Sequence, residues 1–194
     1  MMRLISLLLA FAALPAAAQD MRPQEAARLA DLDATAGEAL LGAFAAGRRG
    51  DIDLLQEALA GSPLPPLQTT LAGDWSCRTF KMGGLVSLVA YAKFDCRITP
   101  DGTRFTFEKL TGSQRTSGTI QIIDGRMIYL GVGTVNDAPQ RAYDALHPAF
   151  IGNGEVQPQV GLVEQSGPDS ARILFPSPVV ESDFDVLWLT RAPG

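Results

Sequence analysis

Apolar residues recur at helical spacing in the first third of the chain. Between residues 24 and 46 they form a stripe of Leu29, Leu32, Ala36, Leu40 and Phe44. Pro23 suits the first turn of this helix, because a proline there loses no hydrogen bond. Asp51 is expected to cap a second, shorter helix that ends before Gly61. The region therefore predicts a pair of helices. A membrane-surface helix is disfavoured, because the polar face carries few Lys and Arg.

From residue 73 onward the pattern changes to short strands separated by turns. Turn-forming residues occur at 100–102, 124–125 and 167–169. They help to delimit eight predicted strands at 74–81, 88–99, 104–110, 116–123, 126–132, 160–165, 171–175 and 183–190. The pattern predicts an eight-stranded antiparallel up-and-down barrel, with a β-sandwich as the alternative.

Some of these strands are apolar on both faces, notably 127–132 and 186–189. An isolated barrel needs only one apolar face, so an outer layer must cover them, and the helical pair is the candidate. The expected fold class is mainly β with N-terminal helices. The expected division of the chain is a signal peptide at 1–18, a helical arm at 19–61, a proline-containing linker at 62–72 and a barrel domain at 73–194.

The first eighteen residues have the pattern of a signal peptide. Arg3 supplies a positive charge, residues 4–14 are apolar, and Ala16-Ala17-Ala18 matches a cleavage pattern. We expect cleavage near Ala18 and a periplasmic or secreted protein. No later apolar stretch has the length of a membrane helix, so stable membrane insertion is not expected.

Export changes the meaning of the two cysteines. In an oxidising compartment the pair favours a disulfide over a redox or zinc role, with paired free thiols as the alternative. A hairpin centred near Val86 is expected to set Cys77 opposite Cys96.

The composition limits the chemistry. Lys and Arg number 16 against 21 Asp and Glu, for a formal net charge of -5, so nucleic acid is not an expected partner. The chain has one histidine and two cysteines, which leaves few of the usual ligands or proton shuttles. We expect no metal and no cofactor, and an enzyme is the less favoured class.

The segment 108–118 is the first candidate binding site. It gathers Glu108, Lys109, Ser113, Gln114 and Arg115 between two predicted strands. Arg115 and neighbouring amides suit a carboxylate or phosphate. The alternative is a structural turn in which Arg115 pairs with Glu108 or Glu181.

The long connection 133–159 is the second candidate. Loops of this length are often functional. Tyr143 and His147 are expected to belong to a lid over one barrel mouth, with a variable surface insertion as the alternative.

Two sets of residues resemble known families. Gly73-Asp74-Trp75 and Arg191 resemble a motif of lipocalin-like barrels, which implies that the arginine stacks over the tryptophan at the closed end. The segments 75–79, 94–98, 108–118 and 181–186 resemble the uncharacterised bacterial exported family called domain of unknown function 4893. This resemblance implies an exported protein and no particular activity.

Two functions remain open. The first is a non-enzymatic binding module with a small molecule or peptide in an apolar pocket at the barrel mouth. The second is a surface-acting inhibitor or partner of an exported hydrolase, with a filled barrel and a rigid exposed loop. A ligand inside the barrel is excluded if the interior is filled by Trp75, Phe94, Phe105, Phe107 and Trp188.

Overall fold

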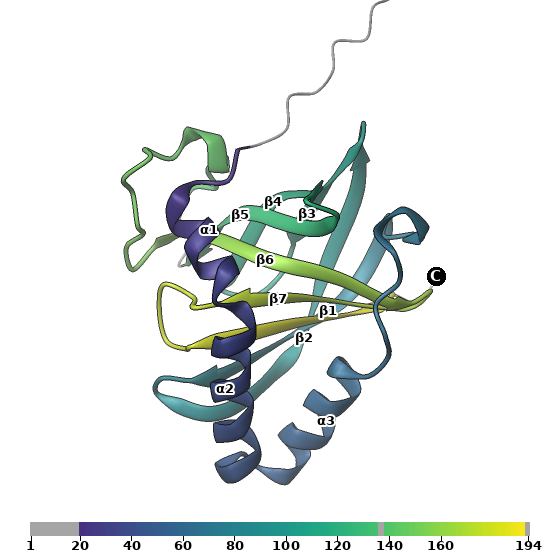
Figure 1. Cartoon of the computed structure of the whole chain (residues 1–194), viewed down its shortest axis with the longest axis vertical. Coiled ribbons are helices and arrows are strands. Elements are labelled where there is room, and N and C mark those ends of the chain that lie inside the picture. The colour runs from purple at the N-terminus through teal and green to yellow at the C-terminus, as the bar shows by residue number, and fades with distance from the viewer. Residues whose placement is uncertain (1–19, 136–137, 193–194) are drawn as a thin grey trace, which may run out of the picture.

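The strands close into one antiparallel up-and-down barrel in sequence order, in a computed structural model that describes residues 20–135 and 138–192. They are β1 (Gly73–Gly83), β2 (Val86–Asp101), β3 (Arg104–Lys109), β4 (Gln114–Ile123), β5 (Arg126–Val135), β6 (Val156–Gly167), β7 (Ser170–Pro176) and β8 (Phe184–Arg191), shown in Figure 1. Pairing of β8 with β1 completes the barrel. The predicted fold class is confirmed. The predicted signal peptide lies outside the described residues.

The helices differ in detail from the expectation. They are α1 (Pro23–Ala30), α2 (Leu32–Ala46) and α3 (Arg49–Leu59), with short 3-10 turns at Pro66–Gln68 (η1) and Tyr143–Ala145 (η2). The single helix predicted over 24–46 is wrong, because the backbone of Asp31 (ψ 7°) leaves helical geometry. The predicted cap at Asp51 is also wrong. The cap of α3 is Arg48, and Asp51 lies in the first turn, where its carboxylate pairs with the Arg48 guanidinium.

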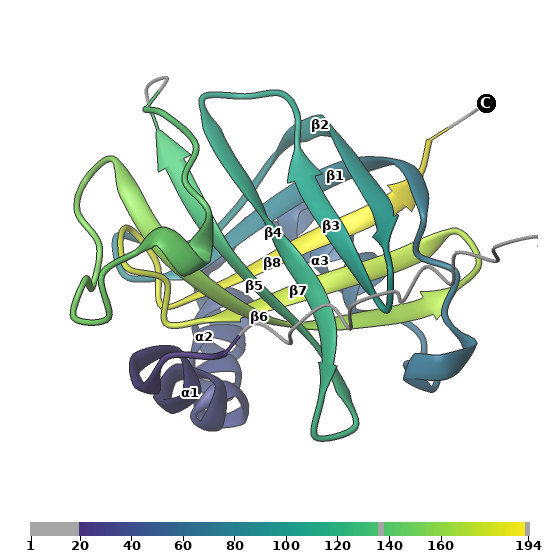
Figure 2. The same cartoon turned by 90° about the horizontal axis from the view of Figure 1, so that it is seen from above.

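The helices cover the outer wall of the barrel on one side, as Figures 1 and 2 show. Leu29, Leu32, Ala39, Ala43 and Leu55 are buried there against outward-facing residues of the strands, among them Phe80, Ile128, Leu130, Val132 and Val186. This is the outer layer predicted from the strands that are apolar on both faces. Phe44 departs from the expected stripe and is 48% exposed. The small side chains of Ala39 and Ala43 face the barrel instead, which lets α2 approach the strands closely.

Aromatic side chains fill the middle of the barrel. The Tyr129 ring makes edge contacts with Phe107 and Phe175, each with ring centroids 5.7 Å apart. Glycine makes room for this ring, since a Cβ at Gly131 would lie 2.0 Å from the Tyr129 hydroxyl. Trp75 and Phe107 are buried in the same inner cluster, and Phe94 and Phe105 pack against it, so the described middle of the barrel is filled. Trp188 does not contribute to this filling, because its ring packs with the outer core cluster.

The predicted disulfide between Cys77 and Cys96 is present, with Cα atoms 5.9 Å apart. The two residues are not directly opposite each other, as the sequence suggested. The register places Cys77 opposite Phe94 and Cys96 opposite Trp75. The β1–β2 turn is centred between Gly84 and Leu85 instead of near Val86, so the bridge joins diagonal neighbours inside the barrel.

The end of the barrel that holds Trp75 is closed. The Arg191 guanidinium carbon lies 3.8 Å from the centroid of the Trp75 ring, the contact that the lipocalin-like resemblance implies. Arg191 also donates hydrogen bonds to the carbonyls of Thr70, Ala72 and Pro168. Gly73 has a φ of 132°, a backbone conformation that favours glycine, and a Cβ there would also lie 2.9 Å from the arginine. The opposite end, where β1 and β3 finish, forms the mouth described next.

Candidate functional site

The mouth of the barrel is lined by polar side chains from several strands. Lys81 of β1 and Asp185 of β8 are directly paired in register. Lys109 ends β3 and is paired with Thr116 of β4. Side chains alternate between the two faces of a strand, so Lys81 points into the barrel like Trp75 and Cys77 of the same strand. Barrel closure therefore places the charged ends of the strands around one recess.

The Tyr129 hydroxyl lies beneath the floor of this recess, which includes Thr116 and Gln159. It lies 2.6 Å from the Thr116 hydroxyl, which also bonds the side-chain oxygen of Gln159. Burial raises the pKa of Tyr129 well above its ordinary value, so the phenol stays neutral. The floor is thus a hydrogen-bonded, uncharged layer above the aromatic core.

Lys109 is a buried cation in the wall of the recess. Its Nζ donates to the carbonyl of Gln114 at 2.6 Å and lies 4.0 Å from the centroid of the Phe94 ring. Among the residues that the structure describes, no carboxylate lies within ion-pair distance of it. Burial, then the charges of Arg115 and Lys81, lower the pKa of Lys109 to about 8. The ammonium therefore lacks a compensating negative charge.

Lys81 has a carboxylate partner, Glu181, from the loop between β7 and β8. The side chain of Lys81 is 7% exposed and that of Glu181 is 45% exposed. The Gln114 amide also donates to the Glu181 carboxylate, at 3.3 Å. The hydrogen bond from Lys81 holds the pKa of the Glu181 carboxyl below its ordinary value. Glu181 thus bridges two strands that face each other across the mouth.

Asp185 is the second carboxyl of the recess. It accepts a hydrogen bond from the Ser182 hydroxyl at 2.6 Å. Burial raises its pKa to about 6, although Ser182 and Lys81 both act to lower it. The negative charge of the recess therefore decreases as pH falls through this value.

Three cavities meet at Gln114. An inner cavity of about 100 Å³ is lined by Tyr91, Phe94 and Ser113, together with Thr79 and both lysines. A second, of about 60 Å³, reaches Thr116, Gln159 and Asp185. A third, of about 330 Å³, forms the rim and is lined by Gln157, Val180 and Glu181 among others. The inner space suits a compact group, and the rim has the volume of a small-molecule site.

The structure brings together most of the binding residues predicted in the segment 108–118. Lys109, Ser113 and Gln114 line the cavities, and so does Arg115. Glu108 is exposed and lies opposite Arg97, on the outer face of the barrel. Neither predicted pairing of Arg115 is present, because its guanidinium donates to the carbonyls of Leu110 and Gly112 in its own loop.

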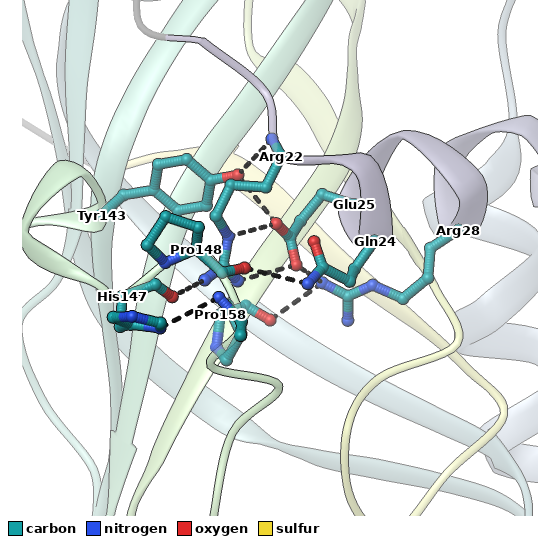
Figure 3. A network of polar contacts seen from close by, with 9 residues as sticks. Arg22, Gln24, Glu25, Arg28, Tyr143, His147, Pro148 and Pro158 are labelled. Atoms are coloured by element: carbon teal, nitrogen blue, oxygen red, sulfur yellow. Dashed lines mark hydrogen bonds and ion pairs between the residues drawn. The ribbon is translucent and has the colours of Figure 1, made fainter.

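Tyr143 and His147 lie elsewhere, beside α1 (Figure 3). The Tyr143 hydroxyl donates to the buried Glu25 carboxylate at 2.9 Å, and the His147 carbonyl accepts from Arg22 at 3.1 Å. Burial raises the pKa of Tyr143 to about 12. Neither residue lines the three cavities of the mouth. In place of a lid, this part of the connection anchors the first helix to the barrel wall.

Sequence reasoning missed several residues of the mouth: Lys81, Thr116, Gln159, Glu181 and Asp185. The two-residue alternation could have identified Lys81, since it shares a face with Trp75 and Cys77. Glu181 lies before the start of a strand, so the two-residue alternation could not place its side chain at the mouth.

Other kinds of site receive no support within residues 20–135 and 138–192. No cluster of three or more His, Cys, Asp or Glu side chains there has the arrangement of a metal site. No helix in the same ranges has both the length and the apolar character needed to cross a membrane.

Comparison with known proteins gives one match. No curated protein and no solved structure matches the chain significantly. A family model described as a domain of unknown function, DUF4893, matches residues 18–189. The chain therefore belongs to the DUF4893 family.

Proposed function

We propose that this chain is an exported, non-enzymatic binding protein that holds a small anionic molecule in the mouth of its barrel. The observation that carries the proposal is Lys109, a buried ammonium whose charge no described carboxylate balances. Lys81 and the Gln114 amide lie at the same recess and supply further donors. A bound carboxylate or phosphate would provide the missing negative charge.

The disulfide supports the exported location. Disulfides persist mainly in oxidising compartments, and the Cys77–Cys96 bridge lies inside the barrel. The expected signal peptide points to the same location.

The test is a titration with inorganic phosphate and, separately, succinate, followed by backbone amide NMR signals. We expect shifts at Thr79, Lys109 and Gln114, which line the inner cavity. Lys109→Met should weaken binding about tenfold, the effect of losing one charge-assisted hydrogen bond. Lys93→Met is the matched control, because Lys93 is an exposed lysine on β2. Equal binding by wild type and Lys109→Met, or no binding by wild type, would contradict the proposal.

One observation favours a second candidate, the hydrolase inhibitor. Leu85, at the tip of the β1–β2 hairpin, is 85% exposed, and an apolar hairpin tip is typical of a surface that inserts into a partner. Native mass spectrometry of the protein purified from its own cells separates the two functions. A bound small mass supports the first, and a co-purifying hydrolase whose binding is lost in Leu85→Ser supports the second.

A further inference from the structure

The Glu181 carboxylate lies between the rim cavity and the inner cavities of the mouth. Glu181 lines the rim cavity, Lys81 lines both inner cavities, and Gln114 lines all three. The contacts of Glu181 with Lys81 and Gln114 therefore lie where the rim meets the inner recess. A molecule in the rim cavity is therefore in contact with the residue that pairs with Lys81.

We infer that the Glu181 carboxylate occupies the position of the ligand's own acid group, and that a bound carboxylate or phosphate displaces it from Lys81 and Gln114. This inference rests on the proposed function, and it adds the ligand's mode of entry and its shape. The ligand is a small polar molecule with one compact anionic group for the inner recess. Its body lies in the rim cavity.

Exchange of one anion for another keeps the buried lysine satisfied. Lys81 is almost completely buried, so removal of Glu181 without a replacement would leave an uncompensated charge. An incoming anion supplies the replacement. An anion that entered with Glu181 still in place would meet the repulsion of that carboxylate, in addition to the repulsion of Asp185 beside Lys81.

The Glu181 side chain can leave without a change in the fold. It is nearly half exposed, so rotation carries its carboxylate into solvent. The backbone of its loop is held independently, because the Glu181 carbonyl accepts from Leu85 and the Asp183 amide donates to the Met82 carbonyl. The displaced group is the side chain alone.

The size of the cavities limits the ligand. The inner cavities of about 100 and 60 Å³ admit a head group of a few heavy atoms. The rim cavity of about 330 Å³ is lined by Ser113, Gln114 and Gln157, which offer hydrogen bonds to a polar body. A large apolar ligand does not fit small inner cavities that open into a polar rim cavity.

The experiment compares inorganic phosphate binding by wild type, Glu181→Gln and Glu155→Gln. Glu155 is an exposed carboxylate next to the start of β6, at the same end of the barrel, so it controls for the loss of one negative charge. We expect a dissociation constant roughly fivefold lower for Glu181→Gln, since the internal competitor has lost its charge, and little change for Glu155→Gln.

A second readout follows the carboxylate itself. The pKa of Glu181, measured by carbon NMR, starts below its ordinary value because of Lys81. Saturating phosphate should return it to the ordinary range, because the displaced group lies in solvent. Phosphate binding by wild type with no gain in Glu181→Gln and with the Glu181 pKa still depressed would overturn this inference and leave the proposed function intact. If wild type binds neither phosphate nor succinate, both the inference and the proposed function are overturned.

Discussion

The Arg191 guanidinium carbon lies over the Trp75 ring at the closed end of the barrel, 3.8 Å from the ring centroid. Arg191 and Trp75 are also partners in the β8–β1 pairing that completes the barrel. The Trp75 indole nitrogen donates to the Leu71 carbonyl at 2.8 Å, so the edge of the ring is held as well as its face. One arginine thus joins the last strand, the first strand and the segment before it.

Arg191→Lys should lower the free energy of unfolding by about 1–3 kcal/mol, because lysine cannot both stack on Trp75 and reach the carbonyls that Arg191 bonds. Urea denaturation measures the difference. Arg126→Lys, at an exposed position in the β4–β5 hairpin at the same end of the barrel, serves as the control. If both variants lose the same free energy of unfolding, the contact between Arg191 and Trp75 does not contribute to stability.

Reduction of the Cys77–Cys96 disulfide should lower the melting temperature. The bridge closes a loop with a sequence separation of 19, and such a crosslink is worth roughly 3 kcal/mol through its effect on the unfolded chain. Thermal unfolding with and without a reductant tests this. The double variant Cys77→Ala/Cys96→Ala should not respond to the reductant, and identical melting of oxidised and reduced wild type would refute the prediction.

Asp185 should make stability depend on pH between about 4 and 6. Its pKa is raised from 3.8 to about 6 in the folded protein, so the folded state holds a proton that the unfolded state releases. The contribution of this carboxyl to stability is greatest below pH 4 and declines as pH rises to 6. Asp185→Asn should therefore be more stable than wild type at pH 7.5, by on the order of 2–3 kcal/mol.

Urea denaturation at a series of pH values follows this effect. Asp95→Asn is the control, since Asp95 is an exposed carboxyl on β2. If wild type and Asp185→Asn differ in free energy of unfolding by the same amount at pH 4 and at pH 7.5, the pKa of Asp185 is not raised by burial.

Glu25→Ala should destabilise the protein by about 3 kcal/mol. Glu25 is 1% exposed and pairs with Arg22 at 2.6 Å and Arg28 at 3.3 Å, so its loss leaves two cations without their carboxylate (Figure 3). Hydrogen exchange should rise first in α1 and in the segment around Tyr143. Glu57→Ala, at an exposed position on α3, should change neither stability nor exchange there.

Much of the fold was predictable because its signals are local. The turn at 124–125 needs a left-handed backbone, and Asp124 and Gly125 have φ values of 49° and 75°. The strands 127–132 and 186–189 are apolar on both faces, which required an outer layer. The break at Asp31 and the exposure of Phe44 were not predictable, because packing against the barrel decides which face of α2 is buried.

The candidate site was only partly predictable. Lys109 and Gln114 lie close together in the sequence, and the polar segment that contains them indicated a binding loop. Lys81, Gln159 and Glu181 come from distant parts of the chain, and their meeting depends on the register of several strand pairs. Tyr143 was misplaced for a similar reason, since its partner Glu25 lies 118 residues away.

The sequence by itself determined the number of strands, the turns that join them, the need for a helical cover and the pairing of the two cysteines. The strands, the turns and the need for a cover follow from residues that are close in the sequence. The cysteine pairing follows because the chain has only two cysteines. The tertiary structure alone decided that aromatic rings fill the middle of the barrel and that two lysines meet at its mouth. Closure of the sheet sets which strand ends face each other, and that relationship is absent from any local pattern.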